Sequence, residues 1–71
     1  MMDLKEIYKK CDYDFFADYF RKEYEFWIAR GDWMQVKLCI ISYCVGYFGM
    51  VNKKLMRLID EAIKLYFDIG G

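Results

Sequence analysis

The stretch that most restricts how this chain can fold is "LCIISYCVGYFGMV", residues 38–51, which carries no charge. Lys37 precedes it, and the next charged residue is Lys53. Such a run is typical of a core helix, of a membrane-spanning helix, or of a surface that another protein covers. A membrane-spanning helix needs about 20 apolar residues, and extending the run back to Trp33 includes Gln35 and Lys37. We therefore favour a core helix.

The amount of apolar side chain is large for a chain of this length. With 71 residues we expect one domain over 1–71, yet 58% of the residues are hydrophobic and 21% are aromatic. A domain this small buries only about 60–65% of the surface that its unfolded chain exposes. The surplus is expected to face a second copy, another protein, or lipid.

Start and stop signals predict four helices. The first is short and begins after Asp3, a candidate N-cap with Glu6 three residues later. The longer helices are expected at about 13–30, 33–48 and 53–68. Their candidate N-caps are Asp12, Asp32 and Asn52. Gly31 is suited to end the second helix in the left-handed conformation. Whether the first helix continues into the second stays open.

The predicted fold class is all-α, a small helical bundle in which the helix at 33–48 lies in the middle. That helix is apolar nearly all round, whereas the helix at 53–68 is amphipathic. The helix at 13–30 carries two aromatic stripes, which predict two packing partners. One stripe contains Phe16, Phe20, Tyr24 and Trp27, and the other contains Phe15, Tyr19 and Phe26. Opposite charges four residues apart predict helix-surface ion pairs for Asp18–Lys22, Arg21–Glu25, Arg57–Glu61, Asp60–Lys64 and Lys64–Asp68.

Residues for catalysis or metal binding are scarce. The chain has no His, the commonest general base, and no Gly-rich phosphate loop. We expect Ser42 to bond back to a carbonyl of its own helix. Cys11, Cys39 and Cys44 lack CxxC spacing, which favours reduced, buried thiols; a disulfide between subunits through Cys11 is the alternative. We expect no enzyme activity, metal or cofactor. The charged first ten residues do not resemble a signal peptide, so we expect a cytoplasmic protein.

A basic cluster supports a second hypothesis, a nucleic-acid accessory protein. Its residues are Lys53, Lys54, Arg57 and Lys64. Eleven basic and eleven acidic residues leave no net charge, however, and acidic neighbours dilute the cluster. A third hypothesis is a small membrane-associated protein with a helix over 33–51 in lipid.

The function that we expect from the sequence is protein–protein recognition by a self-associating module. The chain would act by sterically occupying a partner protein, as an inhibitor or adaptor does. A phage or mobile-element blocker of a host defence nuclease, in the manner of anti-CRISPR proteins, is one such role. Aromatic residues are enriched in interface cores. The candidate partner-binding residues are Phe15, Tyr19, Phe26, Tyr47, Phe48 and Met50. The alternative is that these side chains close the core.

Overall fold

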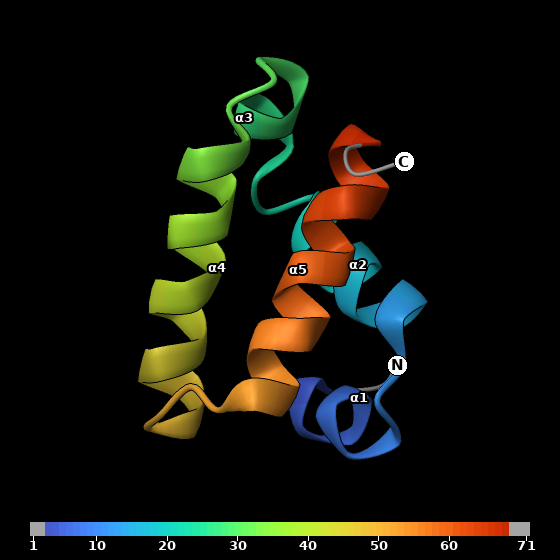
Figure 1. Cartoon of the computed structure of the whole chain (residues 1–71), viewed down its shortest axis with the longest axis vertical. Helices are drawn as coiled ribbons and strands as arrows, with labels where there is room; N and C mark the ends of the chain where they lie inside the picture. The colour runs from blue at the N-terminus through green and yellow to red at the C-terminus, as the bar shows by residue number, and fades with distance from the viewer. Residues whose placement is uncertain (1–2, 69–71) are drawn as a thin grey trace.

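The computed structural model describes residues 3–68, and within that range the chain is all-α (Figure 1). It forms five helices in the order α1 to α5. They are α1 (Leu4–Lys10), α2 (Tyr13–Arg21), α3 (Glu25–Ala29), α4 (Trp33–Phe48) and α5 (Lys53–Phe67). The predicted fold class, a small helical bundle, is confirmed.

Four polar side chains begin four of the helices, as predicted. The carboxylate of Asp3 accepts a hydrogen bond from the Glu6 backbone N–H at 2.9 Å. The same hydrogen bond, from the backbone N–H three residues later to the side-chain oxygen, forms at Asp12, Asp32 and Asn52, with distances of 3.1, 3.3 and 2.9 Å. Each cap satisfies a donor that the helix leaves unpaired and contributes about 1 kcal/mol. Gly31 and Gly49 adopt the left-handed conformation beyond α3 and α4, with φ of 75° and 81°.

The first two helices are separate. Cys11 ends α1 in the left-handed conformation with φ of 53°, and its N–H bonds the carbonyls of Ile7 and Tyr8. Asp12 then caps α2. The tight reversal lets α1 pack against α2 rather than extend it.

The prediction of one helix over 13–30 is wrong, because residues 22–24 form a turn between α2 and α3. Tyr24 leaves the helical conformation, with φ of −116° and ψ of 23°. Its ring stacks on Phe20, and its hydroxyl donates to the carbonyl of Cys39 at 3.4 Å. The turn directs α3 towards α4, so that Trp27 and Ile28 pack against the core. No Gly or Pro marks this break.

The middle of the bundle is α5, and the prediction that the helix at 33–48 would lie there is wrong. In Figure 1, α5 lies between α4 and α2, and it packs against both. Five of its side chains are buried: Leu55, Leu58, Ile59, Ala62 and Ile63. Only three side chains of α4 are buried, namely Val36, Ile40 and Cys44. An amphipathic helix with a wide apolar stripe fits between two neighbours, whereas α4 has a neighbour on one side and leaves apolar residues exposed.

The core also separates the two aromatic stripes. Phe16 and Phe20 are fully buried, and Tyr24 and Trp27 pack partly against the core. Phe15, Tyr19 and Phe26 are exposed by 52%, 37% and 62%. The first stripe is therefore core and the second is surface.

None of the predicted ion pairs four residues apart forms among residues 3–68. Arg21 pairs with Asp18 at 3.7 Å and Lys64 with Glu61 at 3.6 Å, each three residues apart. Asp60 instead bonds Lys37 of α4 at 3.1 Å. This last pair joins α4 to α5 beside the core.

The uncharged run does not form one helix over 33–51, because α4 ends at Phe48. Among the helices described between residues 3 and 68, none combines the length and the apolar character required to cross a membrane.

Candidate functional site

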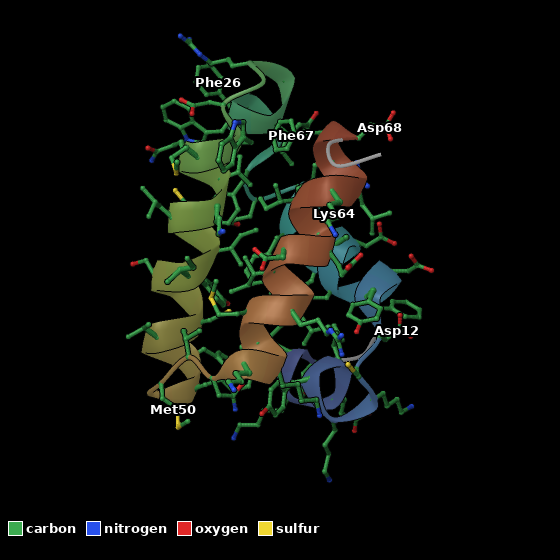
Figure 2. The ribbon with its side chains drawn as sticks, in the orientation of Figure 1. Asp12, Phe26, Met50, Lys64, Phe67 and Asp68 are labelled. Atoms are coloured by element: carbon green, nitrogen blue, oxygen red, sulfur yellow. The ribbon has the colours of Figure 1, made fainter. Side chains whose placement is uncertain are left out.

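The structure divides the predicted partner-binding residues among separate places. Phe15 and Tyr19 are four residues apart on α2 and share one face of it. Phe26 belongs to α3, at one end of the molecule (Figure 2), where its ring contacts Trp27 and the Arg30 guanidinium lies 5.2 Å from the ring centre. The turn at 22–24 therefore interrupts the predicted stripe. Met50 follows α4 at the opposite end (Figure 2) and is 57% exposed.

Tyr43 connects several of the remaining candidates into one aromatic surface. Its hydroxyl lies 3.1 Å from the hydroxyl of Tyr19, and its ring stacks on that of Tyr47 with centres 6.2 Å apart. Tyr47 in turn contacts Phe48, whose ring centre is 5.2 Å from that of Tyr8 in α1. We name the set Tyr8, Tyr19, Tyr43, Tyr47 and Phe48 the tyrosine band. It runs across α1, α2 and α4.

The sequence analysis missed Tyr43 as a binding residue. Its signal was the four-residue spacing to Tyr47, which places both rings on one helix face. The contact with Tyr19 was not visible in the sequence, because these residues are 24 positions apart and meet only through tertiary packing.

The tyrosine band is fixed by contacts with the core and, at its Tyr8 end, with residues at the start of α5. The ring of Tyr43 meets the buried ring of Phe20 edge-on, with centres 5.2 Å apart. At the other end, the Asn52 side-chain amide donates to the Tyr8 hydroxyl at 2.8 Å, and the Lys54 ammonium lies 4.3 Å from the centre of the Tyr8 ring. Rings fixed in this way lose little conformational entropy when a partner covers them.

The phenol of Tyr19 is uncharged at neutral pH. The hydrogen bond with Tyr43, with a smaller contribution from burial, raises the pKa of Tyr19 to about 12. Tyr19, Tyr43 and Tyr47 are exposed by 37%, 36% and 39%. The arrangement presents three amphipathic rings to solvent, each with an apolar body and a polar edge.

The basic residues of the nucleic-acid hypothesis lie mainly on the outer face of α5. Lys53, Arg57 and Lys64 line one groove of about 830 Å³. Asp60 and Glu61 line the same groove and carry opposite charge. The fourth residue, Lys54, is turned towards Tyr8 instead. The structure thus brings three of the four basic residues together, but with two carboxylates among them.

The cysteines are free, and burial raises the pKa of the Cys44 thiol to about 11. A thiol of this kind is protonated at neutral pH and is a poor nucleophile. Cys11 and Cys39 are half-buried. Within residues 3–68, no three His, Cys, Asp or Glu side chains are grouped closely enough to hold a metal ion.

Comparison of the chain with protein-family models, with curated proteins and with solved structures gives no match.

Proposed function

We propose that this protein is a binding module whose tyrosine band docks against a partner protein. The observation that carries the proposal is the set of exposed, mutually contacting rings of Tyr19, Tyr43 and Tyr47. Tyrosine is enriched both in interface cores and among the residues that dominate binding energy. Covering a surface of another protein is how both inhibitors and adaptors act, and this proposal includes both.

The chemistry of the band favours a partner that presents arginine or lysine among apolar side chains. Tyrosine faces attract cations, and two described tyrosine rings of this chain already carry one, Tyr8 with Lys54 and Tyr66 with Arg21. A basic residue of the partner would therefore be stabilised by the ring faces.

The test compares Tyr47→Lys with Phe26→Lys. Both replace an exposed aromatic ring by a cation, but only the first lies in the band. We expect a protein that co-purifies from the native cells with the wild type and with Phe26→Lys, and is lost with Tyr47→Lys. Calorimetry on the purified pair should then show binding weakened by at least about tenfold for Tyr47→Lys only.

A partner that is lost equally with both variants, or only with Phe26→Lys, would contradict the proposal. Circular dichroism of both variants provides the control, since each should keep the helix content of the wild type.

The α5 groove supports nucleic-acid binding as a second candidate, because Lys53, Arg57 and Lys64 share it. The carboxylates of Asp60 and Glu61 oppose this function by repelling phosphates. We therefore expect fluorescence anisotropy to detect no binding to a labelled duplex or to RNA at low salt. Binding that weakens steeply with added salt, and disappears in Arg57→Glu, would favour this candidate over the first.

A further inference from the structure

The side of α4 that faces away from α5 is a continuous uncharged surface. Met34, Leu38 and Val45 are exposed there by 50%, 55% and 47%; Ser42 lies between Leu38 and Val45, and Gly46 follows Val45. Met34, Leu38, Ser42 and Val45 follow one another at intervals of four, four and three residues, and Gly46 lies four residues after Ser42, so they share one helix face. We name these five residues the outer α4 face. In Figure 1 this side of α4 has no other helix beside it.

The charge pattern indicates what kind of surface fits the outer α4 face. The single charged residue of α4 is Lys37, which is turned towards Asp60 of α5. A partner that placed a charged group on this face would bury it without a counter-charge, which is costly. The exposed side of α5 carries Arg57, Asp60 and Glu61 and does not meet this requirement. The outer α4 face of a second copy is uncharged and therefore meets the requirement.

The shape of the face also suits a second copy. A side chain at Gly46 would meet nothing within 4 Å, so the backbone there is open to close approach. Leu38 and Gly46 each lie four residues from Ser42. A two-fold axis beside Ser42, with the helices antiparallel, sets Leu38 of one copy against Gly46 of the other. Antiparallel helices also bring opposite ends of their dipoles together.

The available area falls short of a standard interface and allows a weak, transient dimer. A 16-residue helix is about 24 Å long and about 11 Å across, so half of its side surface is about 400 Å². A specific interface needs about 500 Å² from each copy, roughly one tenth of the 4918 Å² that the chain exposes.

We propose that two copies of this chain form an antiparallel dimer through their outer α4 faces, with Leu38 of each packed on Gly46 of the other. The dimer goes beyond the proposed docking function, because it uses a different side of α4. Tyr43 is turned towards Tyr19 of α2, so both tyrosine bands stay accessible in the dimer.

The main test is sedimentation velocity from about 10 µM to about 1 mM, a range that brackets a dissociation constant of about 100 µM, as expected for a weak dimer. A reducing agent is present, because the three cysteines are free. We expect the wild type to shift from monomer to dimer, and Leu38→Glu to stay monomeric. Leu65→Glu is the matched control, because Leu65 is 50% exposed but belongs to α5. The Leu65→Glu protein should dimerise as the wild type does.

Gly46→Ala gives a second measurement that does not depend on inserting a charge. An alanine here favours the helix and meets no atom in the monomer, so the melting temperature of the dilute protein should rise. The added methyl should nevertheless weaken dimerisation several-fold, because it separates the two helices. A wild type that stays monomeric throughout would overturn the proposal. Equal effects of Leu38→Glu and Leu65→Glu, or undiminished dimerisation of Gly46→Ala, would overturn it as well.

Discussion

At the scale of single residues, Tyr43 determines the character of the candidate site. One edge of its ring is anchored on the buried Phe20, and its hydroxyl reaches Tyr19 on another helix. Phe20 links this surface to the core, because its ring also contacts Phe16 and Tyr24. A substitution at an exposed ring therefore removes few core contacts, whereas a substitution at Phe20 disturbs both the core and the tyrosine band.

The hydrogen bond between Tyr19 and Tyr43 predicts a dependence of stability on alkaline pH. It raises the pKa of Tyr19 from 10.0 to about 12, so the folded state favours the neutral phenol. The stabilisation is complete below pH 10 and is lost as the pH rises towards 12. Because the side chain is partly exposed, we expect an effect below about 1 kcal/mol.

The measurement is the free energy of urea unfolding at about pH 9 and about pH 11. Tyr19→Phe should lose less stability between the two than the wild type does. Tyr47→Phe is the control, because it leaves the bond between Tyr19 and Tyr43 intact. If the Tyr19→Phe protein lost as much unfolding free energy between these two pH values as the wild type, the Tyr19–Tyr43 hydrogen bond would not be the cause.

At the scale of elements, α5 ends at a residue whose conformation and charge both oppose the local structure. Asp68 ends α5 in the left-handed conformation, with φ of 52°, and its charge lies at the negative end of the helix dipole. Glycine adopts this conformation without steric cost, and a carboxylate is unfavourable at this position.

Asp68→Gly should therefore raise the free energy of unfolding by about 1 kcal/mol. Thermal or urea denaturation measures it. Asp68→Asn separates the two causes, because asparagine tolerates the left-handed conformation and removes the charge. A destabilised Asp68→Gly protein would show that the side chain makes a favourable interaction that outweighs both terms.

At the scale of the whole molecule, the surplus of apolar residues remains on the surface. Between residues 3 and 68, eleven large hydrophobic side chains are exposed, and six of them belong to α4. The core is built mainly from aliphatic side chains, and the rings of Phe16 and Phe20 are fully buried within it.

Phe20→Ala should cost about 3–5 kcal/mol, which approaches the entire stability of a small domain. Phe15→Ala in the same helix removes an equal side chain that is 52% exposed, and should cost under about 1 kcal/mol. Denaturant unfolding followed by circular dichroism measures both. Similar costs for the two variants would contradict the assignment of Phe20 to the core and Phe15 to the surface.

The candidate site could be predicted only in part from the sequence. Tyr19, Tyr47 and Phe48 were expected in a binding surface, and they lie in the tyrosine band. Tyr8 and Tyr43 were missed, and Phe26 and Met50 lie at opposite ends of the molecule (Figure 2). Periodicity identifies residues that share a helix face, but it does not show which face of one helix meets which face of another.

The sequence by itself determined the all-α class and the starts of four helices, because Asp3, Asp12, Asp32 and Asn52 act on a backbone N–H only three residues away. Only the tertiary structure decided that residues 22–24 break a helix and that α5 is central. The break has no local signal, since it is stabilised by contacts of Tyr24 with Phe20 and the distant Cys39. The central position goes to α5 because burial depends on which faces find neighbours, and α4, although more apolar, has a neighbouring helix on one side only.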